Sequence, residues 1–155
     1  MSDRRGFTLI ELLIVVSILG VLASIAVPRV QAARAHARAA DVIGALRAVR
    51  VAATIYYDSA NAWPPSGANG AVPAGLAGYL PRNGNGIFTG SGWTLRWRSR
   101  TVWNGSSFSV QGTMQVRTSD PLLCLPLATL LGGPSSTVSI SCNGGNGRIT
   151  QTVER

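Results

Sequence analysis

The sequence has no lysine, one histidine and few acidic residues, and these shortages limit the chemistry it can support. All fourteen basic residues are arginines, six residues are aspartate or glutamate, and His36 is the one histidine. A hydrolase needs a nucleophile, a base and an acid that can be brought together, and we find no such set. The sequence therefore argues against a hydrolase on a membrane anchor, and we predict that the chain is not an enzyme.

Cysteine is equally scarce, since Cys124 and Cys142 are the only two. Two thiols and His36, which lies on a distant segment, do not make a tetrahedral metal site, so we expect no metal and no cofactor. If the C-terminal part is exported, a disulfide is the natural interpretation of the two cysteines. Such a bond would add about 2–4 kcal/mol of stability. Two buried free thiols are the alternative.

Charged residues are also few, and their balance is strongly basic. They make up 13% of the 155 residues, against 46% apolar residues, and the formal net charge is +8. This composition is not that of a disordered chain, and the length suits one modest domain with an appendage. The charge fits contact with nucleic acid, an anionic membrane surface or an acidic partner, and it equally fits a solvated basic surface.

A long apolar run, residues 7–28, is the most prominent feature of the chain. Its twenty-one residues before Pro28 would form about 31 Å of helix, enough to cross the core of a bilayer. Arg4 and Arg5 flank its start, which places the N-terminus in the cytoplasm. A secretory signal peptide usually has a shorter apolar region. A plain single-span anchor explains everything in the run except Glu11.

Glu11 is unusual because it lies one turn inside this apolar run. A carboxylate there costs on the order of 2–4 kcal/mol unless it is protonated, near the interface or paired. No arginine lies three or four residues away, so a cationic partner has to come from another molecule. A free α-amine on Phe7 would serve, but only if the chain were cut after Gly6.

Residues 6–11, Gly-Phe-Thr-Leu-Ile-Glu, resemble the processing site of type IV prepilins and type II secretion pseudopilins, and the match extends to Pro28. The resemblance implies that a prepilin peptidase cleaves between Gly6 and Phe7 and N-methylates the new Phe7 amine. It also implies that Glu11 pairs with the Phe7 amine of a neighbouring subunit during filament assembly. The expected function is a structural filament subunit.

The resemblance and the apolar run together predict four segments. They are a leader (1–6), a transmembrane and filament-core helix (7–28), a helical stem (29–58) and a globular β head (59–155). The chain would be a single-pass inner-membrane protein with a periplasmic head, and later part of a periplasmic or extracellular filament. The implied partners are the peptidase, other pilin or pseudopilin subunits, an inner-membrane assembly platform, and membrane lipid before assembly.

Helical periodicity continues beyond the apolar run. Apolar residues recur at steps of four and three, which predicts a buried seam, at Val42, Leu46, Val49, Ala53 and Tyr56. We expect one helix from about residue 7 to 57, bent near Pro28 because proline removes a backbone hydrogen bond. Gly20 weakens the helix further, and the resemblance implies that the stretch between Gly20 and Pro28 can lose helicity in filaments. Arg34, Arg38 and Asp41 form a stripe suited to solvent.

Residues 93–117 predict a β-hairpin around Asn104–Gly105. One face carries the apolar residues Trp93, Leu95, Trp97 and Trp103, and the other carries Arg96, Arg98 and Arg100. Because the two residue types fall on opposite faces, the pattern favours a core face packed on the helix seam and a wet face. Alternating tryptophan and arginine can also contact nucleic acid. The alternative function is therefore a DNA-binding pilin that uses these arginines as a polyanion contact.

The remaining segments complete an α+β fold, a long helix packed on a small antiparallel sheet. Residues 66–92 predict a surface loop with an apolar patch at Leu76, Tyr79 and Leu80, and strands are expected at 137–142 and 148–153. A Cys124–Cys142 bond resembles the C-terminal disulfide loop of many pilins. Secretion major pseudopilins more often have a calcium loop there, but Asp120 and Glu154 are the only C-terminal acids, too few for an oxygen cage.

Overall fold

The computed structural model describes residues 8–84, 86–103, 105–133, 135, 137–143 and 146–153. The chain divides into two compact units, Met1–Arg34 and Ala35–Arg155, which are described in turn. Six residues used above lie outside the described residues: Arg4, Arg5, Gly6, Phe7, Asn104 and Glu154.

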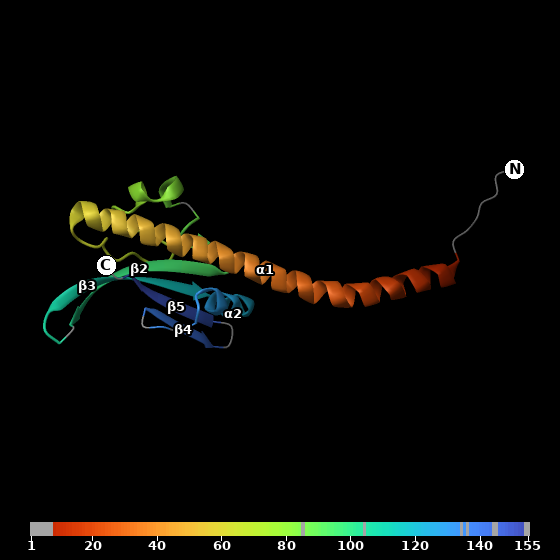
Figure 1. Ribbon diagram of the computed structural model, residues 1–155. Helices are drawn as coiled ribbons and strands as arrows, with labels where there is room; N and C mark the ends of the chain where they lie inside the picture. Colours follow the sequence, from red (N-terminus) through yellow and green to blue (C-terminus); the bar gives the residue numbers. More distant parts are fainter. Residues whose placement is uncertain are drawn as a thin grey trace. The chain divides into compact units, whose positions relative to one another are not determined.

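Helix α1, Leu9–Ala60, is the predicted long helix and runs through the boundary between the two units (Figure 1). Pro28 lies inside it without ending it, and the bend there stays a prediction. The helix ends where Asn61 adopts a left-handed φ of 49° and donates its N–H to the carbonyl of Tyr57. Asparagine tolerates this conformation and closes the last turn, three residues beyond the predicted end.

Within Ala35–Arg155, the later part of α1 packs along one face of a sheet (Figure 1). The predicted seam is confirmed, because Val42, Leu46, Val49 and Ala53 are buried and Tyr56 is half-buried. Small residues between them, Ala45 and Ala52, are also buried. Alanine at these positions lets the helix backbone approach the sheet closely.

The sheet has five antiparallel strands in the order β1-β2-β3-β5-β4. They are β1 (Thr89–Gly90), β2 (Trp93–Trp103), β3 (Phe108–Thr118), β4 (Val138–Asn143) and β5 (Asn146–Val153). The predicted hairpin is β2–β3, and the two predicted C-terminal strands are β4 and β5. The last strand, β5, lies between β3 and β4. The long helix and the antiparallel sheet together make the expected α+β fold.

In the central part of the sheet, every second residue of a strand faces the core. Trp93, Leu95 and Trp97 of β2 are buried, and their cross-strand partners in β3 and β5 continue the same layer. Trp97 is fully buried, and its indole N–H donates to the carbonyl of Pro64 at 2.9 Å. This satisfied polar group allows a large aromatic residue to occupy the centre of the core.

Trp103 differs from the prediction that all four apolar residues of this strand pack on the helix. It is 54% exposed and contacts the ring of Phe108, with 4.7 Å between the ring centroids. The pairing of β3 with β5 begins at Gly112, so the outer part of the hairpin is only two strands wide. Trp103 therefore lies beyond the region that the core covers.

The segment between α1 and β2, which was predicted to be a surface loop, contributes residues to the core. Leu76, Leu80 and Phe88 are buried, whereas Tyr79 is 39% exposed. The segment contains two short 3₁₀ helices, η1 (Ala77–Tyr79) and η2 (Pro81–Gly84). Two residues of the predicted surface patch, Leu76 and Leu80, are therefore core residues, and only Tyr79 is exposed. The spacing of the three residues follows neither a helix period nor a strand period, so the sequence pattern did not indicate this burial.

Backbone hydrogen bonds also hold this segment in place. The N–H groups of Gly67 and Gly70 donate to the carbonyls of Trp97 and Leu95. These contacts run along the edge of β2 and satisfy backbone groups that a free loop would leave to water.

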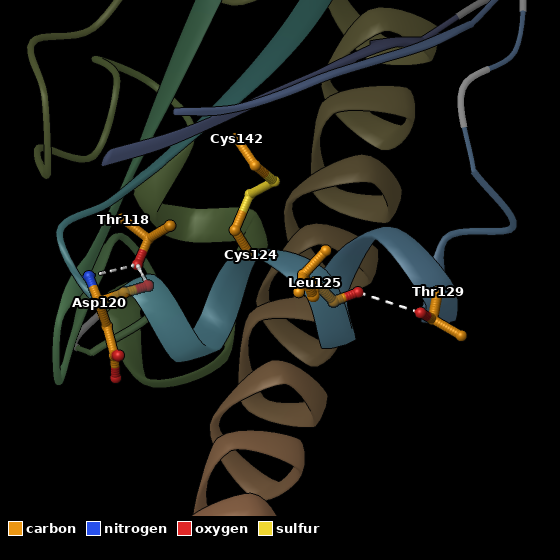
Figure 2. The surroundings of a disulfide bond; sticks show 6 residues. All are labelled: Thr118, Asp120, Cys124, Leu125, Thr129 and Cys142. Carbon is orange, nitrogen blue, oxygen red and sulfur yellow. Dashed lines mark hydrogen bonds between the residues drawn. A yellow bond between two sulfur atoms is a disulfide. The ribbon is translucent and has the colours of Figure 1, made fainter. Parts of the chain in front are cut away.

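Helix α2, Pro121–Leu130, forms from the apolar stretch that precedes β4. Asp120 caps it, because its Oδ1 accepts a hydrogen bond from the N–H of Leu122 at 3.0 Å, a common way to satisfy a first-turn donor. Thr118 holds Asp120 in turn, since its hydroxyl accepts from the Asp120 N–H at 3.0 Å (Figure 2).

The predicted disulfide joins Cys124 of α2 to Cys142 of β4, with 6.0 Å between the Cα atoms (Figure 2). Gly147 of β5 pairs with Cys142. A Cβ at Gly147 would lie 2.7 Å from the Cys124 sulfur. A glycine at this place therefore leaves room for the disulfide against the sheet.

Candidate functional site

The apolar part of α1 has the composition of a buried helix but is exposed within its unit. Its Leu, Ile and Val side chains from Leu9 to Val27 are 46–85% exposed. The most apolar window has a mean hydropathy of 2.7, and none of it is buried. Length and composition therefore suit this helix to cross a membrane, although a signal sequence can have the same properties.

The polar side chains of this segment have partners within the helix. Ser17 donates to the carbonyl of Ile14 at 2.8 Å, and Ser24 donates to that of Val21 at 2.7 Å. Hydroxyls bonded in this way do not need water. The two serines are therefore compatible with an apolar environment.

Glu11 has a local hydrogen-bond partner, Thr8, which carries no charge. The Thr8 hydroxyl and N–H donate to Oε2 of Glu11 at 2.7 and 3.0 Å, and the Glu11 N–H donates back to the Thr8 hydroxyl at 3.3 Å. This reciprocal arrangement is a capping box, and the spacing Thr-x-x-Glu is its sequence signature.

The cap places the carboxylate at the start of the helix but does not neutralise it. Within residues 8–84, no cation pairs with Glu11, and both hydrogen bonds to its carboxylate use Oε2. Oε1 can therefore accept from a further donor. The expected partner, the amine of Phe7 on another subunit, involves a residue outside the described part of the chain.

Gly20 and Pro28 both lie in the helical part of the first unit. No atom lies within 4 Å of the place where a Cβ on Gly20 would be, so packing within the chain does not require a glycine there. Pro28 has no N–H to give to the carbonyl of Ser24. The helix therefore lacks one backbone hydrogen bond at this point.

The second candidate site is the sheet face away from the core. Arg96, Arg98 and Arg100 lie on it, because they alternate with the buried residues of β2. Arg117 of β3 and Arg148 of β5 lie on the same face, since both alternate with buried residues of their strands. We call these five residues the arginine face.

The arginine face has no acidic residue among its described positions. The described acids of the second unit are Asp41 and Asp58 on α1 and Asp120 at the start of α2. Asp120 forms an ion pair with Arg38 of α1, which corrects the prediction that Arg38 simply faces solvent. Of the five arginines, only Arg96 has a side-chain hydrogen bond within the described chain, from Nε to the carbonyl of Gly67 at 3.0 Å.

Metal binding has no support in the described residues, where no group of three or more His, Cys, Asp or Glu side chains could hold an ion. His36 is exposed on α1, as expected for a solvent-facing helix residue. The apolar part of α1 and the arginine face are therefore the two candidate sites considered below.

Comparison with known proteins supports the first of these features. Residues 1–27 match the family model of the prokaryotic N-terminal methylation motif. The chain is 39% identical over 74 residues to a type IV major pilin protein of Neisseria gonorrhoeae, covering 48% of this chain and 32% of the relative. A fimbrial protein of Neisseria meningitidis is 38% identical over 69 residues, covering 44% of this chain and 41% of the relative.

A fimbrial protein of Eikenella corrodens is 35% identical over 75 residues, or 48% of this chain and 49% of the relative. The matches with these three proteins therefore span only a third to a half of the relatives' own lengths. No solved structure matches the chain. The predicted resemblance is nevertheless confirmed: the chain carries the prokaryotic N-terminal methylation motif and is similar over part of its length to type IV pilins and fimbrial proteins.

Proposed function

We propose that this chain is the precursor of a structural subunit of a type IV pilus-like or type II secretion filament. The observation that carries the proposal is the apolar part of α1, whose side chains are exposed throughout while its hydroxyls are bonded internally. Such a helix needs apolar surroundings from outside its own chain. Lipid supplies them before assembly, and the same helices of neighbouring subunits supply them in the filament.

The proposed maturation begins with cleavage between Gly6 and Phe7 by a prepilin peptidase, which then N-methylates the new Phe7 amine. Glu11 of one subunit then pairs with the Phe7 amine of the next. An unpaired charge among apolar helices is costly, and a charge pair lowers that cost. The capping box supports this role, because it holds the carboxylate in place and leaves Oε1 able to accept a bond from the incoming amine.

The proposed location follows from the same helix. The precursor lies in the inner membrane as a single-pass protein with a cytoplasmic N-terminus and a periplasmic head, and it later joins a periplasmic or extracellular filament. Its partners are the peptidase, other pilin or pseudopilin subunits and an inner-membrane assembly platform. No catalytic role is assigned to the chain.

Cleavage is tested by purifying the protein from its native membrane and sequencing its N-terminus. We expect the chain to begin at Phe7, with the mass of one added methyl group on the amine. Gly6→Leu should leave the leader attached, whereas Ser2→Ala in the same leader should be processed normally. A native protein that still carries residues 1–6 would overturn the proposed maturation.

A second function is contact with nucleic acid through Arg96, Arg98 and Arg100. The specific observation in its favour is that these side chains lie on the sheet face away from the core, where the described positions include no acid. Binding of DNA by the full chain in detergent, weakening steeply as salt rises, would support this function. No binding at low salt would exclude it.

A further inference from the structure

The second function proposed above leaves open which nucleic acid binds and which residues anchor it. We infer that Arg117 and Arg148 anchor a phosphate backbone, and that the arginine face binds duplex DNA in preference to single strands. The inference rests on the proposed nucleic-acid contact and adds two residues that sequence reasoning did not single out.

The pairing of β3 with β5 places Arg117 directly opposite Arg148 on the same face. Directly opposed residues have Cβ atoms about 4.5–5.5 Å apart, and like charges at such positions repel each other. Both arginines are exposed, and no acidic residue lies on the described part of this face. A phosphate between the two guanidinium groups would replace this repulsion with charge-assisted hydrogen bonds.

Polar residues surround this arginine pair. Thr94 of β2 lies opposite Arg117 on one side, and Ser141 of β4 lies opposite Arg148 on the other. A hollow of about 420 Å³ opens beside the pair, lined by Arg117, Thr118, Ser141, Asn146, Gly147 and Arg148. Hydroxyl and amide donors next to two arginines are the groups that contact phosphate oxygens in protein–DNA complexes.

The other three arginines extend the site along β2. Arg96, Arg98 and Arg100 lie opposite Gln115, Thr113 and Gln111 of β3. Each therefore has a polar neighbour on β3, and no described position of this face carries an acid. Alternate residues of a strand are about 6.6–6.8 Å apart. The three arginines therefore form a row of evenly spaced positive charges that can follow a sugar-phosphate backbone.

The absence of aromatic residues from the described arginine face favours duplex DNA. Proteins that bind single strands stack the bases on aromatic side chains. Trp93 and Trp97 are in the core, and Trp103 alternates with them on β2 and so faces away from the arginines. A face of arginine, threonine, glutamine and serine can contact a sugar-phosphate backbone but offers the bases no stacking surface.

The test measures binding of the full chain in detergent to a 20-base-pair duplex and to a 20-nucleotide single strand, between 50 and 200 mM salt. We expect tighter binding of the duplex, without sequence preference. The logarithm of the binding constant should fall against the logarithm of salt concentration with a slope of about −0.9 per phosphate contact, or up to about −4.5 for five arginines.

Arg117→Gln combined with Arg148→Gln should reduce the magnitude of this slope by about 1.8. The matched control is Arg47→Gln combined with Arg50→Gln, which removes the same charge from exposed positions of α1 and should leave the slope unchanged. An unchanged urea midpoint in both double variants would show that the head is still folded.

The outcomes separate this inference from the proposal beneath it. No binding of either DNA would defeat the nucleic-acid function itself. Binding that prefers single strands, or that responds equally to both double variants, would overturn the inference while leaving nucleic-acid contact in place. A sulfated polysaccharide that bound as tightly as the duplex, with the same dependence on Arg117 and Arg148, would overturn the assignment to DNA.

Discussion

The two parts of helix α1 contain similar residues in opposite situations. Leu22, in the first part, is 58% exposed, whereas Leu46, in the second, is 3% exposed. Thirteen Leu, Ile and Val residues lie exposed between Leu9 and Val27, far more than single scattered surface residues would explain. The second part buries its seam on the sheet of the same chain, so only the first part depends on other molecules for its burial.

This contrast explains how one helix can serve two purposes. Burying one Leu, Ile or Val side chain contributes about 1.5–3 kcal/mol. In the second part that free energy stabilises the fold of the head. In the first part it is available for burial against molecules outside the chain, which we propose to be lipid and then neighbouring subunits.

The largest expected effect concerns the first part of the helix. Replacing Glu11 with leucine removes the carboxylate that is proposed to pair with the neighbouring amine, and we expect filament assembly to be lost while membrane insertion is retained. Ser17→Ala is the matched control, because it replaces another polar residue of the same apolar run but leaves the carboxylate and its cap, so filaments should still form. Electron microscopy and membrane fractionation measure the two properties. Normal filaments from the Glu11 variant would contradict the pairing.

The comparison between the two parts is made directly by the same substitution in each. Leu46→Ala should lower the free energy of unfolding of the head by about 2–5 kcal/mol, because it opens a cavity in the core. Leu22→Ala should leave that free energy unchanged, because Leu22 has no part in the head. Urea unfolding of the full chain in detergent, followed by tryptophan fluorescence, measures both, since all four tryptophans lie beyond residue 60. Equal losses would show that the two units unfold together.

The smallest expected effect tests the joint between α1 and α2 in the head. Asp120→Ala removes the cap of α2 and the ion pair with Arg38, and should cost about 1–2 kcal/mol of unfolding free energy. Asp120→Asn keeps a capping side chain and removes the charge. Because the Arg38 side chain is 38% exposed, the Asn variant should lose less than about 1 kcal/mol. Equal losses in the Asn and Ala variants would mean that the ion pair with Arg38, and not the helix cap, makes the contribution.

The elements of the fold were predictable where their patterns are local. The seam from Val42 to Ala53, the β2–β3 hairpin and the two C-terminal strands follow from periodicity within short windows. Counting predicts which cysteines would pair, because two cysteines allow one intrachain disulfide, but the sequence left two free thiols as the alternative. The capping box at Thr8 and Glu11 could also have been predicted, since its signature is four residues long.

Other features depend on contacts between distant segments. Leu76, Leu80 and Phe88 become core residues because the segment after α1 folds back along β2. No helix or strand periodicity in this segment predicts their burial. Trp103 is exposed because the sheet narrows to two strands at the tip of the hairpin. Periodicity assigned it correctly to a face of the strand but could not tell how far the core extends.

The sequence by itself determined that the chain has an apolar helix with one carboxylate near its start, continued by an amphipathic helix and followed by short strands. Local spacing is sufficient for that, because helix and strand periods are properties of neighbouring residues. Only the tertiary structure decided that β5 lies between β3 and β4, which places Arg148 opposite Arg117. Strand order is a relation between segments far apart in the chain, so the composition of the arginine face could not be read from any one of them.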